Sequence, residues 1–186
     1  MLATSSQLDV DSYFLDEMQR LQLMHADLLI LGACPEHDYN KRCEVDTLKQ
    51  FSYPKVLRHS KFCLVFRGER MGQLALLEAM ASGCIPVVVM DGVVMPFSGT
   101  IDWNRAAVFV MEEFLSTVMD VLEKVSDNRI EEMQSQVRFL YEEYFSSMGA
   151  IVRTTLDVIQ DRVYPQWGRT YDDWNVPPES VSWFML

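Results

Sequence analysis

The sequence predicts an α/β fold in which a parallel β-sheet is covered by helices on both faces. Short apolar runs alternate along the chain with segments whose apolar residues recur every three to four positions, which is the pattern of strands alternating with helices. Residues 85–90 are nearly all apolar and rich in valine, as is typical of a central strand buried on both faces. The length of 186 residues, with 49% hydrophobic and 23% charged residues, suits one globular domain.

Strands and helices are expected to alternate through the first half of the chain. An apolar run predicts the first strand at 28–31, and Pro54 opens a short helix at 53–59, because proline suits the first turn of a helix. The next strand covers 62–66, and a loop at 67–71 leads into a helix over 72–82. Gly83 ends that helix, since glycine readily adopts the left-handed conformation of a helix end. The valine-rich strand at 85–90 follows.

Helices are expected to dominate the second half. After a loop at 92–99 and a strand at 106–110, apolar residues at helical spacing predict helices over 112–125 and 128–145. A last helix covers 148–163 and is stopped by Pro165. We expect a helical or irregular segment at 1–27, one sheet domain at 28–165, and an irregular tail at 166–186 that packs over the domain surface.

The acidic composition argues against nucleic acid as a principal partner. The formal net charge is −11, and this charge is repelled by a phosphate backbone. An anionic glycan would need a local basic patch. No apolar run reaches the roughly 18 residues that span a bilayer, and the first seven residues lack the features of a signal peptide. We therefore expect no membrane span in this chain and no unaided entry into a secretory compartment.

The four cysteines have a spacing that suits two pairs. Cys34 and Cys43 bracket a short polar loop, while Cys63 and Cys84 each lie near the start of a predicted strand. If these strands are parallel neighbours in register, the Cα atoms of Cys63 and Cys84 lie about 5 Å apart, within disulfide range. Buried cysteines that act only as small hydrophobes remain an equal alternative. Zinc is disfavoured because the chain has no CxxC pair and its histidines are scattered.

The segment at 60–102 has the layout of a nucleotide-binding site. Ligands of open parallel sheets bind at the carboxyl ends of the strands, where helix N-termini offer backbone N–H groups to a diphosphate. Gly68 and Gly72 would let the backbone approach that diphosphate, and Arg67 would neutralise it. Glu78 is either a ribose ligand or part of a solvated helix face. Asp91 is either a ligand or an ordinary turn residue.

Short motifs in this segment and beyond resemble one family. The chain carries, in order, SKFCLV at 60–65, RG at 67–68, EA at 78–79, GCIPV at 83–87, PFS at 96–98 and IDW at 101–103. These are followed by EEMQ at 131–134, YF at 144–145, DRVYP at 161–165, WN at 174–175 and PP at 177–178. In this order and without large gaps, they resemble the exostosin glycosyltransferases of family 47, over roughly 28–178.

The resemblance implies a GT-B architecture of two Rossmann-like lobes, of which this chain looks like the C-terminal, donor-binding lobe. It implies a UDP-sugar donor, either UDP-glucuronate or UDP-N-acetylglucosamine, and a glycosaminoglycan acceptor in heparan sulfate biosynthesis. It implies no cofactor or metal, and it assigns no catalytic residue. Family members work in the Golgi or endoplasmic reticulum lumen, where disulfides persist. The implied nucleotide-sugar ligands are Arg67, Gly68, Gly72, Gln73, Glu78 and Asp91.

One departure from the family bears on activity. Family members that look active carry Ser and Arg where this chain has Gln73 and Ala75. The loss of a guanidinium at a diphosphate removes a charge-assisted contact. A non-catalytic lobe that stabilises a partner exostosin in a heterodimer is therefore the alternative function, and we expect this chain alone to be inactive.

Overall fold

The computed structural model describes residues 3–5, 12–36, 38, 40–67 and 74–177. Within these residues a single sheet has the strand order β4-β3-β2-β1-β5-β6-β7. Neighbouring strands from β2 to β7 are parallel, whereas β3 and β4 form an antiparallel hairpin at the other end. The parallel strands are β1 (Ala3–Ser5), β2 (Leu28–Gly32), β5 (Phe62–Phe66), β6 (Ile85–Val89) and β7 (Val108–Val110). The hairpin strands are β3 (Lys41–Glu44) and β4 (Gln50–Ser52).

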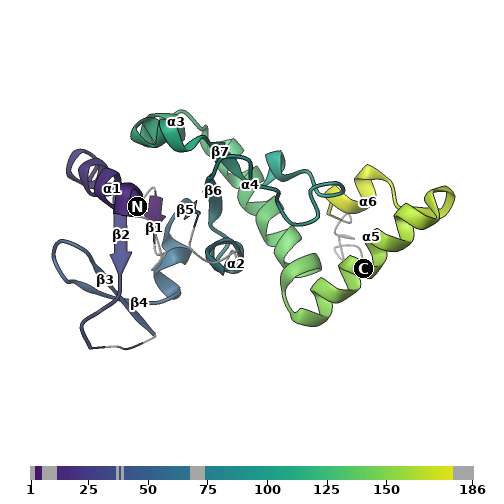
Figure 1. Cartoon of the computed structure of the whole chain (residues 1–186), viewed down its shortest axis with the longest axis horizontal. Helices are drawn as coiled ribbons and strands as arrows, with labels where there is room; N and C mark the ends of the chain where they lie inside the picture. The colour runs from purple at the N-terminus through teal and green to yellow at the C-terminus, as the bar shows by residue number, and fades with distance from the viewer. Residues whose placement is uncertain (1–2, 6–11, 37, 39, 68–73, 178–186) are drawn as a thin grey trace, which may run out of the picture.

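Helices cover both faces of the sheet, which confirms the predicted fold class (Figure 1). Successive residues of a strand point to opposite faces, so Phe62, Leu64 and Phe66 pack on one side and Val65 on the other. The first side is covered by α1 (Ser12–Met24) and α3 (Val118–Glu123), and the second by α2 (Leu74–Ala81). Buried residues of α4 (Asp127–Leu140) contribute to both clusters.

The C-terminal third packs beyond α4, away from the sheet (Figure 1). The predicted helix at 128–145 is continuous, but its last turn, η4 (Tyr141–Phe145), is π-helical. Ser147 caps α5 (Met148–Val163), whose bounds agree with the prediction. The tail is not wholly irregular, because it contains η5 (Pro165–Trp167) and α6 (Tyr171–Asn175). The capping box of Thr170 and Asp173 opens α6, and Trp174 anchors it in the second cluster.

Three short strands were not predicted. β1 lies between β2 and β5, so the N-terminal segment supplies a strand to the middle of the sheet. The hairpin of β3 and β4 begins within the segment that Cys34 and Cys43 bracket, and Cys43 lies in β3 itself. These strands have three or four residues each, too few for a periodic signal. These segments are strands because they pair with neighbouring strands, and their own composition does not predict it.

Some predicted elements differ in type or length. The short helix after Pro54 is the 3-10 helix η1 (Lys55–His59). The helix expected at 112–125 divides into the 3-10 helix η3 (Glu112–Thr117) and α3. At the division, the Thr117 hydroxyl donates to the carbonyl of Phe114 at 3.0 Å, a local bond that competes with α-helical pairing. β7 begins late because η2 (Trp103–Arg105) extends its last turn to Ala107.

Both predicted disulfides are present. Cys63 of β5 is bonded to Cys84, which directly precedes β6, with 5.8 Å between their Cα atoms. Cys34 is bonded to Cys43 of β3, with 5.0 Å between the Cα atoms. The strand adjacency that motivated the Cys63–Cys84 pair is confirmed by the parallel register of β5 and β6. Within the described residues, no helix combines the length and the apolar composition that a membrane span requires.

Candidate functional site

Polar side chains follow the last three parallel strands at the edge of the sheet where they end, called here the carboxyl edge. Arg67 directly follows β5, Asp91 follows β6, and Glu112 follows β7. Nη2 of Arg67 lies 3.4 Å from Oε2 of Glu112. The Glu112 N–H donates to Oδ1 of Asp91 at 3.1 Å, and the Asp91 N–H donates to Oε1 of Glu112 at 3.4 Å. Glu112 thus brings Arg67 and Asp91 together.

The charges of this cluster decide what it can bind. The Glu112 carboxylate faces the Arg67 guanidinium, and the Glu112 side chain is only 18% exposed whereas that of Arg67 is 61% exposed. An anionic ligand at Arg67 would therefore compete with Glu112 for the guanidinium. The sequence interpretation missed Glu112, although an acidic residue shortly after a third parallel strand was the available signal.

Glu78 lies in the second turn of α2, on the helix that leads from β5 to β6. Its Oε2 accepts a hydrogen bond from the hydroxyl of Tyr53, and Tyr53 is only 7% exposed. Glu78 is itself half-buried. The carboxylate therefore faces the segment between β4 and η1, so the interpretation as a solvated outer face is wrong.

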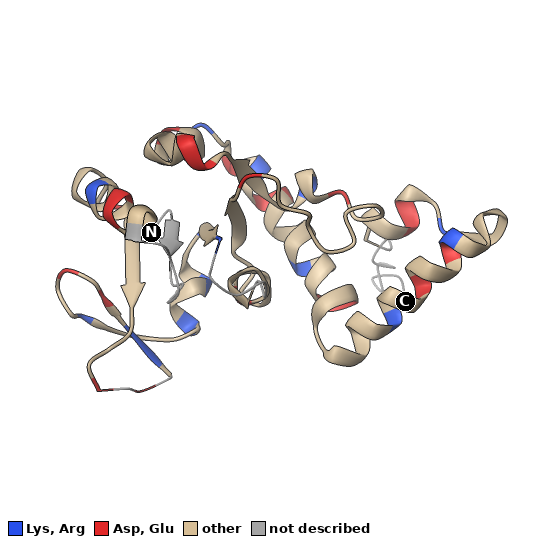
Figure 2. Cartoon of the chain, viewed as in Figure 1, with Lys and Arg blue, Asp and Glu red and all other residues tan. Residues whose placement is uncertain are grey.

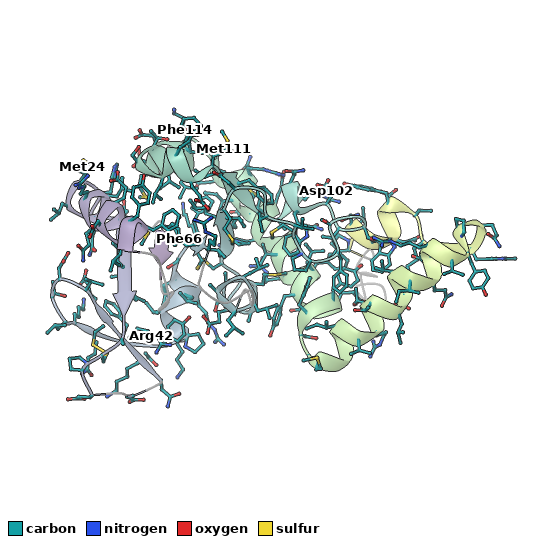
Figure 3. The ribbon with its side chains drawn as sticks, viewed as in Figure 1. Met24, Arg42, Phe66, Asp102, Met111 and Phe114 are labelled. Carbon is teal, nitrogen blue, oxygen red and sulfur yellow. A yellow bond between two sulfur atoms is a disulfide. The ribbon has the colours of Figure 1, made fainter. Side chains whose placement is uncertain are left out.

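The hairpin places Tyr53 on the same side of the sheet as Glu78. In the register of β3 with β4, Arg42 lies opposite Phe51, and the chain then continues through Ser52 to Tyr53. The guanidinium carbon of Arg42 lies 4.3 Å from the centre of the Tyr53 ring, a cation–π distance. Figure 3 shows Arg42 on the hairpin, across from Phe66 at the end of β5. Neither Tyr53 nor Arg42 was predicted as a site residue.

Gly68, Gly72 and Gln73, three of the predicted nucleotide-sugar ligands, lie outside the described residues. Ala75, the second position that departs from the family, lies in the first turn of α2. Its side chain is half-buried against the second core cluster.

A separate hollow of about 470 Å³ lies beside the loop that joins β6 to β7 and is closed on one side by Tyr171 of α6. Asp102 lines this hollow, and its Oδ2 accepts the Tyr171 hydroxyl at 2.6 Å. This hydrogen bond, with a second one from the backbone N–H of Asn104, holds the pKa of Asp102 below its usual value. The same carboxylate caps η2.

Charged residues of both signs are interspersed over the described chain (Figure 2). Several basic side chains are already paired with acidic ones, among them Lys61 with Asp127 at 2.9 Å and Arg169 with Asp157 at 2.6 Å. Within the described residues, no group of three or more His, Cys, Asp or Glu side chains is placed to hold a metal ion.

Comparisons with known proteins point to one family. The profile of the exostosin GT47 domain matches residues 9–125. Exostosin-2 of Homo sapiens and of Mus musculus are each 40% identical to this chain over 185 residues, which is 96% of this chain and 25% of theirs. Exostosin-1b of Danio rerio is 39% identical over 159 residues, covering 82% of this chain and 22% of its own. The chain thus spans about a quarter of the length of these relatives.

Among solved structures, one described as "Crystal structure of GtfA/B complex" matches with a TM-score of 0.49 and 14% identity. The match covers 83% of this chain and 35% of that one. A likeness at this level adds nothing to the fold described above.

Proposed function

The chain belongs to the exostosin GT47 family of glycosyltransferases, and from this membership we propose that it forms the lobe that binds a UDP-sugar. The donor is UDP-glucuronate or UDP-N-acetylglucosamine, and the acceptor is a glycosaminoglycan chain of heparan sulfate. In this proposal the lobe is the C-terminal half of a GT-B enzyme, with the donor at the carboxyl edge of its sheet.

The observation that carries the proposal is the convergence of Arg67, Asp91 and α2 at that edge. Open parallel sheets bind ligands outside the carboxyl ends of their strands. α2 follows β5 directly in this topology, so its N-terminus faces the same edge, and backbone N–H groups at a helix N-terminus bind phosphate well. Arg67 then contacts the diphosphate and Glu78 the ribose hydroxyls, while Gly68, Gly72 and Gln73 belong to the connection between β5 and α2.

Isothermal titration with UDP tests this proposal. We expect the wild-type chain to bind UDP and the Arg67→Met variant to bind it about tenfold more weakly, because a charge-assisted contact is lost. Arg129→Met is the matched control, since Arg129 is paired with Glu132 on α4, outside the carboxyl edge. Equal UDP affinities for both variants would contradict a diphosphate site beside Arg67.

A second candidate function is a scaffold lobe that stabilises a partner exostosin in a heterodimer. Two features favour it: Ala75 stands where family members that look active carry Arg, and Glu112 already pairs with Arg67. Both weaken the attraction of the edge for a diphosphate. A chain that shows no heat of binding with millimolar UDP, yet co-elutes with a co-expressed exostosin in size-exclusion chromatography, would favour the scaffold.

The proposal extends to domain organisation and location. Residues 28–165 form the body of the donor lobe, to which the segment at 1–27 adds β1 and α1 and the tail at 166–186 adds α6. The lobe works in the lumen of the Golgi or endoplasmic reticulum, because an oxidising compartment preserves disulfides such as Cys34–Cys43 and Cys63–Cys84. Localisation of the tagged full-length protein, with mapping of its thiols, tests this part.

A further inference from the structure

The contact between Tyr53 and Glu78 joins the hairpin to α2. The segment at 60–102, which was predicted to bind a nucleotide, includes Glu78 but not Tyr53. Tyr53 follows β4 at the base of the hairpin, and Glu78 lies on α2, beyond β5. The Tyr53 hydroxyl donates to Oε2 of Glu78. Within the described residues, Oε1 of Glu78 has no donor of its own. Among these residues, one carboxylate oxygen is thus occupied by Tyr53 and the other accepts no hydrogen bond.

Tyr53 is itself held from several directions. Its backbone N–H donates to the carbonyl of Asn40 at 2.8 Å, which extends the hairpin pairing by one residue. The guanidinium of Arg42 lies over its ring at 4.3 Å, and the ring is buried in the cluster that contains Ala79 of α2. The Cys34–Cys43 disulfide ties the strand that carries Arg42 to the segment after β2. The phenol hydroxyl therefore stands at a fixed place beside α2.

A fixed donor restricts the carboxylate that accepts from it. A glutamate side chain on a helix has three rotatable bonds and loses conformational entropy when it is ordered. A hydrogen bond from a rigid, buried tyrosine supplies that ordering before any ligand arrives, so the ligand does not have to supply it. Glu78 then presents Oε1 in one orientation.

We infer that Tyr53 is the positioning residue that orients Glu78 toward the ribose hydroxyls of the donor nucleotide. Arg42 supports it by holding the phenol ring. The inference rests on the proposed function, because it takes the ligand of Glu78 to be the ribose. It goes beyond that function by assigning a role to the hairpin. The hairpin strands stand at one end of the strand order, and β7 stands at the other.

The test measures dissociation constants of two ligands, UDP and 2′,3′-dideoxyuridine diphosphate, by isothermal titration. For Tyr53→Phe we expect UDP to bind about tenfold more weakly, because the ligand must then order the Glu78 side chain itself. The dideoxy ligand is expected to bind wild type and Tyr53→Phe equally, because it has no ribose hydroxyls for Glu78 to accept. Tyr53→Phe combined with Glu78→Gln is expected to bind UDP no more weakly than Glu78→Gln alone.

Tyr144→Phe is the matched control, because it also removes the hydroxyl of a buried tyrosine. That hydroxyl donates to the carbonyl of Trp174 at 2.9 Å, in the C-terminal third. This variant is expected to lower stability without changing the affinity for either ligand. If Tyr53→Phe weakened both ligands equally, Tyr53 would have only a structural role and the inference would be wrong.

The remaining outcomes separate the inference from the proposed function. If Glu78→Gln weakened UDP binding selectively and Tyr53→Phe left it unchanged, the inference would fail and the proposed function would stand. If wild type bound neither ligand, the donor-binding function would fail, and the role of Tyr53 with it. If wild type bound both ligands equally, Glu78 would not be a ribose ligand and the inference would be overturned, although nucleotide binding would stand.

Discussion

Replacement of Asn175 by aspartate is expected to destabilise the protein in a pH-dependent manner. Asn175 is 0% exposed, and its Oδ1 accepts the backbone N–H of Asp102 at 2.7 Å. Its Nδ2 donates to the carbonyl oxygens of Thr100 and Tyr171, each at 3.0 Å. In Asn175→Asp the acceptor remains, but the two donor hydrogens are replaced by an oxygen that faces two carbonyl oxygens.

The magnitude follows from the burial of this carboxylate. Burial and two facing carbonyl oxygens raise the pKa of an aspartate by about 3 units, and each unit corresponds to about 1.4 kcal/mol. The folded pKa then lies above the unfolded value of about 3.9, so stability falls as the pH rises between the two values. We expect a loss of about 4 kcal/mol at pH 8 that shrinks to about 1.5 kcal/mol at pH 5. The missing second donor adds about 1 kcal/mol at every pH.

Urea unfolding of wild type and Asn175→Asp between pH 5 and pH 8 measures this difference. Asn128→Asp is the control, because Asn128 is exposed in the first turn of α4, where a negative charge costs nothing or slightly stabilises. A loss for Asn175→Asp that did not change with pH would show that the new carboxylate is solvated. That result would refute the buried position of Asn175 between Thr100 and α6.

Three further predictions concern the disulfide, alkaline stability and activity. The double variant Cys63→Ala with Cys84→Ala opens a loop with a sequence separation of 21. We expect chemical denaturation to show that the free energy of unfolding falls by about 3 kcal/mol. A fall below about 1 kcal/mol would be inconsistent with a bridge that restrains the unfolded chain. Burial raises the pKa of Tyr144 to about 12, above the unfolded value of about 10, so its contribution is complete below pH 10 and is lost as the pH rises toward 12. Tyr144→Phe should therefore flatten the fall in unfolding free energy between pH 10 and pH 12, and an unchanged slope would contradict the assignment. This chain alone should show no sugar transfer from UDP-glucuronate or UDP-N-acetylglucosamine to a heparosan oligosaccharide. The orientation of two substrates lowers a reaction barrier by roughly 7–11 kcal/mol, and one lobe loses most of that contribution. Turnover of about 1 per second would refute this prediction.

Strong local patterns allowed the central elements to be predicted. The strands at 62–66 and 85–89 are continuous apolar runs, and the structure places them as parallel neighbours. The helix at 148–163 has its cap residue before it and Pro165 after it. The strand pattern allowed the disulfide Cys63–Cys84, because adjacency of parallel strands brings their starts together, but it left unpaired buried cysteines as an equal alternative.

The local sequence pattern did not predict the contacts between residues that lie far apart along the chain. The sequence alone placed Arg67 and Asp91 at strand ends and Glu78 on a helix, but Glu112 and Tyr53, which contact them, lie 21 to 45 residues away along the chain. The same holds for β1, a three-residue strand that exists through its pairing with β2 and β5. Periodicity records how a segment buries its own apolar face, whereas register, strand order and helix placement decide which distant polar groups meet. Only the tertiary structure therefore shows that a tyrosine at the base of the hairpin holds the carboxylate of α2.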